Sequence, residues 1–143
     1  MADYFESIGS GEHLLGWQDG DLLSHLMWVP RSLQPGDKPP LRTAYVEMVA
    51  TVPGAQGRGY ATKLLENFPS QVQDFDLAAL SPATETLYTR LGWRYWQGPL
   101  AVRTESGLVP TPEEQVMVLA LPRTPRLDLE LTLSVEWRPG EVW

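Results

Sequence analysis

A buried strand, a glycine-rich turn and an amphipathic helix follow one another without a break between Arg42 and Phe68. Arg42–Val52 is largely apolar, β-branched or aromatic, the pattern of a central strand covered on both faces. Residues 53–59 read PGAQGRG, and the apolar positions that follow recur at helical spacing, at Tyr60, Ala61, Leu64, Leu65 and Phe68. Such a chain must place a helix N-terminus, with its free backbone N–H groups, beside the end of a central strand. We expect Pro69 to stop or kink this helix near Phe68.

The remaining elements are predicted to be mostly strands. Extended segments are expected at His13–Gln18 and Leu22–Val29, joined across Asp19-Gly20, and at Phe75–Leu80, Trp93–Trp96 and Val116–Leu121. Leu127–Trp137 alternates apolar and polar residues throughout, the clearest strand pattern in the chain. The stretches rich in proline and glycine, at residues 30–40, 98–112 and 122–125, are expected to be connectors.

A second helix is predicted over Pro82–Leu91. Ser81 would be its N-cap, Pro82 would occupy its first turn, and Gly92 would end it in a left-handed conformation. Two helices beside several strands predict an α/β, or α+β, fold with a mixed and mostly antiparallel sheet flanked by helices.

Size and composition narrow the class of protein. The 143 residues lie just under the ~150 of a typical domain, so we expect one domain over residues 1–143. Cysteine is absent, which excludes disulfides, thiolate metal sites and cysteine nucleophiles, and the two histidines, His13 and His25, are expected to be residues of a sheet face. A net charge of −7 disfavours nucleic-acid binding and favours a cationic ligand. With neither a signal-peptide pattern nor an apolar run of about 20 residues, we expect a cytoplasmic protein without a membrane partner.

Three kinds of phosphate-binding loop compete for the segment from Gln56 to Ala61. A Walker loop needs Lys and then Ser or Thr after Gly59, where this chain has Tyr60 and Ala61. A dinucleotide fingerprint needs a third small residue at Thr62 and an acidic residue after the next strand, which ends at Leu80-Ser81. The third kind, the coenzyme A loop Q/R-x-x-G-x-G/A, is matched by Gln56, Gly59 and Ala61.

The segment TLYTRLGW, residues 86–93, resembles the helix end of GNAT-superfamily acetyltransferases, and it follows the loop at the separation that this superfamily shows. Further segments are similar to the aminoglycoside 2'-N-acetyltransferases, among them Tyr45–Val49, Ala79–Ser81, Leu87–Pro99, Thr111–Glu114 and the ending Glu136–Trp143. The resemblance implies a GNAT-like acyl-CoA N-acyltransferase fold that uses acetyl-CoA. It also implies acetyl transfer to a primary amine of a cationic small molecule, with the 2'-amine of an aminoglycoside as the first expectation.

The resemblance also implies roles for individual residues. Three residues are expected to be catalytic, namely Glu47, Tyr88 and Trp143. Glu47 would act on the substrate amine, Tyr88 would donate a proton to the coenzyme A thiolate, and the α-carboxylate of Trp143 would attract the ammonium. Ser81 and Glu114, with Trp143, are expected to bind the acceptor. Cofactor binding is expected from the backbone of Val49 and Thr51 and from the loop residues Gln56, Gly57, Arg58, Gly59, Tyr60 and Ala61. Trp93 and Trp96 are expected to line the acceptor cleft, and Glu113, Glu136 and Glu141 to be solvated.

Other interpretations of these residues stay open. Glu47 is the only charge between Arg42 and Arg58, and strand alternation places it on one face with Tyr45, Val49 and Thr51. A carboxylate there must be functional or partnered, and an arginine partner is the plain alternative. Tyr88 could equally be ordinary helix packing.

This chain departs from the family pattern in two places. Only residues 1–12 precede the first predicted strand, so we expect the N-terminal strand and helices of the family to be truncated. The three aspartates of the family are replaced by Glu113-Glu114-Gln115, and Val116 stands at a glycine position. The alternatives are therefore a non-catalytic acyl-CoA-binding module, a GNAT that acts on a different amine, and a nucleotide-binding protein. A homodimer is one way to close the open side of the acceptor site.

Overall fold

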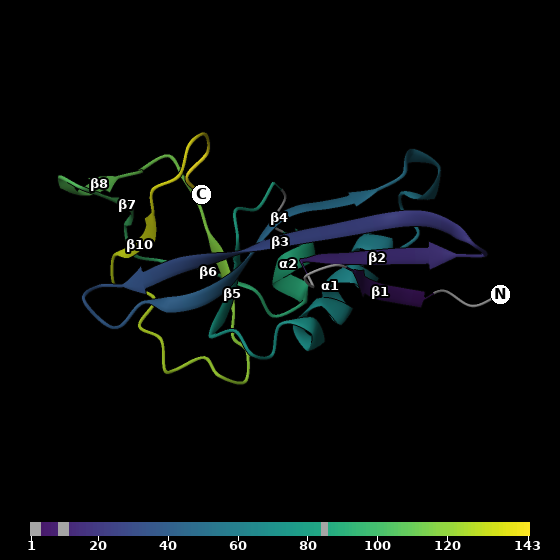
Figure 1. The fold of residues 1–143 in the computed structure, drawn as a ribbon, viewed down its shortest axis with the longest axis horizontal. Helices are drawn as coiled ribbons and strands as arrows, with labels where there is room; N and C mark the ends of the chain where they lie inside the picture. The colour runs from purple at the N-terminus through teal and green to yellow at the C-terminus, as the bar shows by residue number, and fades with distance from the viewer. Residues whose placement is uncertain (1–3, 9–11, 84–85) are drawn as a thin grey trace.

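The computed structural model describes residues 4–8, 12–83 and 86–143. Among these residues, ten strands form one mixed sheet in the order β6-β9-β5-β4-β3-β10-β7-β8, with β2 also paired to β3 and β1 paired to β2 (Figure 1). The strands are Tyr4–Ile8 (β1), His13–Gln18 (β2), Asp21–Pro35 (β3), Leu41–Thr51 (β4), Leu77–Leu80 (β5), Arg94–Tyr95 (β6), Leu100–Thr104 (β7), Gly107–Pro110 (β8), Met117–Leu119 (β9) and Leu133–Glu136 (β10). The helices are the 3-10 turn Pro53–Ala55 (η1), Tyr60–Gln71 (α1) and Thr86–Arg90 (α2).

The sheet has a separate apolar core on each face. One core packs α1, through Leu64, Leu65 and Phe68, against alternate residues of β2 to β5. The other core lies on the opposite face and holds Tyr45, Trp96 and Trp143 together with residues of β5, β7 and β10. Alternate residues of β4 and β5 enter different cores, so both strands are covered on both faces, which confirms the prediction for the first half of Arg42–Val52.

Strand β4 contains a bulge at Glu47. In the antiparallel pairing of β3 with β4, Met27 is opposite Met48 and Trp28 is opposite Val46, so Glu47 has no partner. An extra residue reverses the alternation beyond it, and Val49 packs against the α1 core instead of sharing the face of Tyr45. The predicted common face of Tyr45, Glu47, Val49 and Thr51 is therefore wrong.

Strand β3 is longer than predicted, because it continues through Pro30 to Pro35. Beyond residue 29 it stays paired with β4, as far as Leu33 opposite Leu41. On its other side, residues 21–27 pair with β2 and residues 33–35 with β10. Pro30 lies between those two partners, where a missing N–H removes no ladder hydrogen bond on that side.

The long alternating segment Leu127–Trp137 is a strand only over Leu133–Glu136. Residues before it form turns in which the Asp128 side chain accepts a hydrogen bond from the N–H of Glu130, while Leu127, Leu129 and Leu131 still pack on the second core. The pattern therefore predicted correctly that these three leucines face the core, but it was wrong about their extended conformation, and Ser134 of the predicted polar face is buried. Trp137 is exposed, contrary to the pattern.

The helices and the connectors also differ from prediction. Helix α1 runs to Gln71, with Pro69 inside its last turn. Residues 81–83 are not helical and the described part of α2 begins at Thr86, so Ser81 does not cap it and the predicted start at Pro82 is wrong. The expected connector at residues 98–112 contains the β7–β8 hairpin, and β1 precedes the first predicted strand. Figure 1 shows this hairpin and the β1–β2 pair near opposite ends of the long axis.

Candidate active site

A pocket of about 240 Å³ lies where β4 and β5 separate. Their parallel pairing ends at Val46 opposite Leu80, so Glu47 and Ser81 are the first residues beyond the last pair. Ligands of sheets with parallel strands bind at such carboxyl ends. The pocket is lined by Tyr45, Val46, Glu47, Ser81, Glu114, Glu141 and Trp143. The structure thus brings together four residues that the sequence analysis named for the acceptor side, namely Glu47, Ser81, Glu114 and Trp143.

Glu47 forms a two-pronged ion pair with Arg138. Nη1 of Arg138 donates to Oε1 of Glu47, and Nη2 donates to Oε2 at 3.3 Å. The side chains are 22% and 26% exposed, so the pair is largely withdrawn from water. The hydrogen bond to Glu47 raises the pKa of the Arg138 guanidinium. The arginine partner that was the alternative interpretation of Glu47 is thus present. Each carboxylate oxygen has a second lone pair, which can accept a hydrogen bond from a ligand.

Tyr45 is a buried residue that lines the same pocket, and nothing in the sequence pattern marked it as a site residue. Its hydroxyl has no hydrogen-bond partner among the described residues. Burial, and then the charge of Glu47, raise the pKa of Tyr45 well above its usual range. The guanidinium carbons of Arg31 and Arg138 lie 5.5 and 5.8 Å from the centre of its ring.

The C-terminal segment closes the pocket. Nε1 of Trp143 donates to Oγ1 of Thr111 at 2.9 Å, and the buried indole belongs to the second core. Glu141 is exposed, as expected, but it also lines the pocket, and Glu113 is exposed. The expectation that Glu136 is merely solvated is wrong, because its carboxylate accepts hydrogen bonds from Arg31 Nε at 2.8 Å and from the N–H of Ser32 at 3.0 Å.

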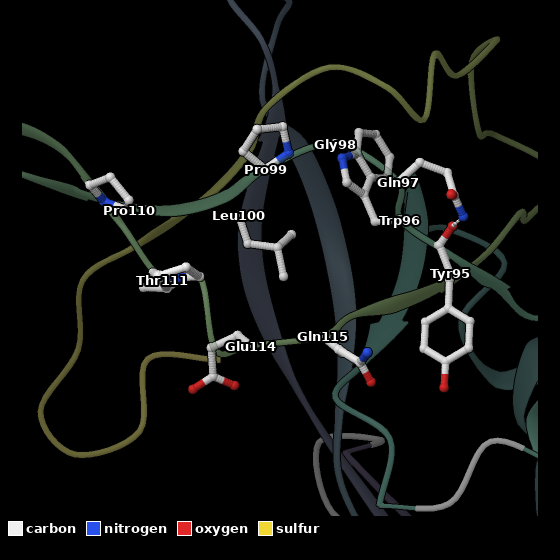
Figure 2. Close-up of a pocket in the computed structure, with 11 residues that line it drawn as sticks. Tyr95, Trp96, Gln97, Gly98, Pro99, Leu100, Pro110, Thr111, Glu114 and Gln115 are labelled. Atoms are coloured by element: carbon white, nitrogen blue, oxygen red, sulfur yellow. Dashed lines mark hydrogen bonds between the residues drawn. The ribbon is translucent and has the colours of Figure 1, made fainter.

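A larger cavity of about 700 Å³ adjoins this pocket, and Glu114 lines both (Figure 2). One wall is Tyr95–Leu100, and the other comes from residues between Pro110 and Gln115. Trp96 lines this cavity, and its Nε1 donates to the carbonyl of Leu131 at 2.7 Å. Trp93 instead lies in the α1 core with 1% of its surface exposed, so its expected place in the cleft is wrong.

The glycine loop presents free backbone N–H groups at the start of α1. Gly57 and Gly59 have φ values of 80° and 81°, which residues with a side chain rarely adopt. No atom lies within 4 Å of a Cβ added at either position, so the space around both glycines is open. Gly59 is the N-cap and supplies no side-chain cap. Within the described ranges, the N–H groups of Gly59, Tyr60, Ala61 and Thr62 donate to no other group. The positive end of the helix adds to this arrangement, which suits an anion such as a diphosphate.

The other predicted cofactor residues lie close to this loop in the chain. The side chain of Gln56 donates to the carbonyl of Thr51 at 3.3 Å, and Arg58 is exposed. Beyond Val46, β4 pairs with no described residue on its β5 side, so the backbone of Val49 and Thr51 has a free edge. An open edge that leads to a helix N-terminus fits an extended amide-containing arm that ends in phosphates.

Tyr88 lies apart from the residues that line the Glu47 pocket. It packs against the α1 core, edge-on to Trp93, with ring centres 6.1 Å apart. Burial raises the pKa of its hydroxyl, which keeps the group protonated. Val49 packs against the same core, so the side chains of Tyr88 and Val49 lie on the same face of the sheet.

The two histidines contact each other instead of joining this site. Nδ1 of His13 and Nε2 of His25 are 2.8 Å apart across β2 and β3, and the rings are stacked. Burial and the neighbouring His13 lower the pKa of His25.

A parallel pair that separates beside a helix-capping glycine loop is the arrangement found in acyl-CoA N-acyltransferases, and residues 2–96 match the acetyltransferase (GNAT) domain family. The chain belongs to this family of acetyltransferases. Over 99% of its length it is 34% identical to the aminoglycoside 2'-N-acetyltransferase of Mycolicibacterium fortuitum, of which it covers 75%.

Solved structures with little sequence similarity confirm the predicted fold. The GNAT acetyltransferase of Brucella melitensis in complex with acetyl-CoA gives a TM-score of 0.56 at 19% identity, over 89% of this chain and 66% of that one. YhbS of Escherichia coli in complex with CoA gives 0.58 at 18%, over 88% and 66%. A GCN5-related N-acetyltransferase of Kribbella flavida gives 0.56 at 21%, over 61% of this chain, which spans 23% of that protein. None of the helices in the described ranges has the length and hydrophobicity needed to cross a membrane.

Proposed function

We propose that this protein transfers an acetyl group from acetyl-CoA to a primary amine of a cationic aminoglycoside, at the 2' position. The observation that carries the proposal is the gathering of Glu47, Ser81, Glu114 and Trp143 in one pocket where β4 and β5 separate. The relative that is 34% identical bears the name of this activity, which supports the choice of acceptor.

The donor side is supported by the chemistry of the glycine loop. Free N–H groups from Gly59 to Thr62 would hold the diphosphate, and Arg58 adds a positive charge beside them. The free edge of β4 at Val49 and Thr51 would pair with the amides of the pantetheine arm. When bound, acetyl-CoA supplies a thioester whose carbonyl carbon an amine can attack.

The acceptor side is supported by charge and by size. Glu47, Glu114 and Glu141 line the pocket, which favours an ammonium over a neutral ligand. At about 240 Å³ the pocket is smaller than the roughly 300–1,000 Å³ of typical small-molecule sites. It would hold the reacting amino sugar, and the adjoining cavity of about 700 Å³ (Figure 2) would hold the other rings, with Glu114 in the lining of both.

Each step of the acetyl transfer can then be assigned to a residue of this chain. Glu47 takes a proton from the ammonium, directly or through a water molecule, so that nitrogen regains its lone pair. The C–N bond forms as the C–S bond breaks, the nitrogen loses its second proton to solvent, and the Tyr88 hydroxyl donates a proton at sulfur. Glu47 then releases its proton to solvent and Tyr88 takes one up, so that one proton is released in each turnover. Ser81 and Trp143 orient the amine.

The test is thiol release from acetyl-CoA with two sets of aminoglycosides, which carry an amine or a hydroxyl at the 2' position. We expect release only with the amine set, with acetylation at 2' shown by NMR of the product. Glu47→Gln should lower kcat/KM by roughly 10²–10⁴-fold, the usual size of a general-base contribution, without changing CoA affinity in calorimetry. The exposed neighbour Glu113→Gln serves as the matched control.

Other results would favour the alternatives. CoA binding without any amine-dependent thiol release would indicate a non-catalytic acyl-CoA-binding module. Release with other polyamines alone would indicate a different acceptor, and binding of ATP but not of CoA would indicate a nucleotide site.

A further inference from the structure

Arg138 makes more contacts around the pocket than an incidental ion-pair partner would. Its two Nη groups engage both oxygens of Glu47, its Nε donates to the carbonyl of Glu141 at 2.6 Å, and its guanidinium lies near the ring of Tyr45. A guanidinium held at all three nitrogens has one orientation, and it imposes one orientation on the carboxylate.

The fold anchors Arg138 through the residue two positions before it. Glu136 accepts hydrogen bonds from Arg31 and from the backbone of Ser32, and its own carbonyl accepts from Arg31 Nη2 at 2.9 Å. Arg31 is 5% exposed, so this attachment of the C-terminal segment to β3 is buried. This attachment places Arg138 next to the bulge in β4.

We propose that Arg138 is a positioning residue for Glu47, which fixes the direction of its carboxylate beside the acceptor. The inference rests on the proposed function and deepens it. Glu47 is the extra residue of a bulge, so the strand alone fixes its side chain less firmly than a paired position would. The guanidinium supplies the missing constraint.

The charged groups around the pair show what the loss of Arg138 would change. They are Arg31 on β3, Glu114 before β9, Glu136 at the end of β10 and Glu141 in the C-terminal segment, and the Tyr45 ring lies against the guanidinium. Because Glu47, Glu114 and Glu141 line the pocket, removing the guanidinium leaves the pocket more negative and frees the Glu47 side chain to rotate.

The test compares Arg138→Gln, which removes the charge, with Arg138→Lys, which keeps the charge but loses the fork. In Arg138→Gln we expect kcat to fall at least about tenfold because the Glu47 carboxylate is misoriented, while KM for the cationic acceptor falls because the pocket becomes more negative. In Arg138→Lys the KM should stay unchanged and kcat alone should fall.

Two further measurements keep the inference independent of the proposed function. In the Glu47→Gln background, Arg138→Gln should lower kcat no further. Crystal structures should show one orientation of the Glu47 carboxylate in the unmodified chain and a different orientation, or several, in Arg138→Gln, whether or not any amine is acetylated. An unchanged Glu47 orientation in Arg138→Gln, or a fall in kcat that is equally large without Glu47, would overturn the inference. A chain that acetylates no amine but shows the change in Glu47 orientation would contradict only the proposed function. Thermal unfolding confirms that each variant is folded.

Discussion

Arg31 occupies a position on β3 where a buried apolar side chain would be the usual choice. Its side chain is 4% exposed and its Nε lies 2.8 Å from Oε1 of Glu136, whose side chain is 41% exposed. The Nη1 atom is buried and makes no hydrogen bond to the described residues. Desolvation of a guanidinium is costly, so this ion pair holds β3 and β10 in register more than it adds net stability.

Removing the carboxylate of Glu136 should reveal the cost of burying the Arg31 guanidinium. Glu136→Gln leaves Arg31 buried without a counter-charge, and we expect the free energy of unfolding to fall by about 2 kcal/mol, less than the ~3–5 kcal/mol of a fully buried pair because Glu136 is partly solvated. Denaturation with urea measures it. The double variant Arg31→Met, Glu136→Gln should recover part of the loss, and a double variant that loses more than the single one would contradict this account.

At the scale of elements, two irregular segments approach each other as closely as paired strands. The N–H groups of Gln97 and Gly98 both donate to the carbonyl of Leu129, at 2.9 and 2.8 Å. A Cβ at residue 98 would lie 2.0 Å from the carbonyl oxygen of Leu131. Only glycine permits this contact, which closes the second core beside the large cavity.

Gly98→Ala should therefore separate the two segments. The clash is with backbone atoms that cannot rotate away, so we expect a loss of at least about 2 kcal/mol, at the upper end of overpacking effects. Gly54→Ala is the control, since nothing lies within 4 Å of its added Cβ. Equal urea midpoints for the two variants would show that the segments yield easily.

At the scale of the whole molecule, the site is assembled from parts that are distant in the chain. Glu47 comes from β4, Ser81 follows β5, Glu114 precedes β9, and Trp143 ends the C-terminal segment. Trp143 belongs to the second core as well as to the pocket, so one residue serves both the packing and the proposed acceptor site. The glycine loop leads into α1, which packs in the opposite core through Leu64 and Leu65.

Trp143→Ala should thus affect the two substrates differently. We expect the free energy of unfolding to drop by about 3 kcal/mol, as for other truncated core aromatics. The kcat/KM for the amine should fall while CoA affinity, measured by calorimetry, stays unchanged. Trp143→Phe, which loses the bond to Thr111 but keeps an aromatic ring, should recover most of the stability. A parallel loss of CoA affinity would show that the two halves of the site are coupled.

Local sequence patterns predicted some elements of the fold and missed others. Elements whose conformation is set by residues adjacent in the chain were predicted correctly. They are the strand, glycine loop and helix between residues 42 and 68, the hairpin at Asp19-Gly20 and the short strand before Ser81. The extension of β3 through Pro30 and the β7–β8 hairpin depend on which strands lie alongside, so residue pattern alone did not predict them.

By itself, the sequence determined the order of the central elements, the free helix N-terminus and the residues that carry acidic groups, because these depend on spacing and side-chain chemistry. Tertiary structure alone decided that Glu47 stands at a bulge, that Arg138 holds it from 91 residues away, and that Glu136 is an anchor. Such pairings arise when distant segments are desolvated together, and an arginine or a glutamate in the sequence does not reveal which partner burial will bring to it.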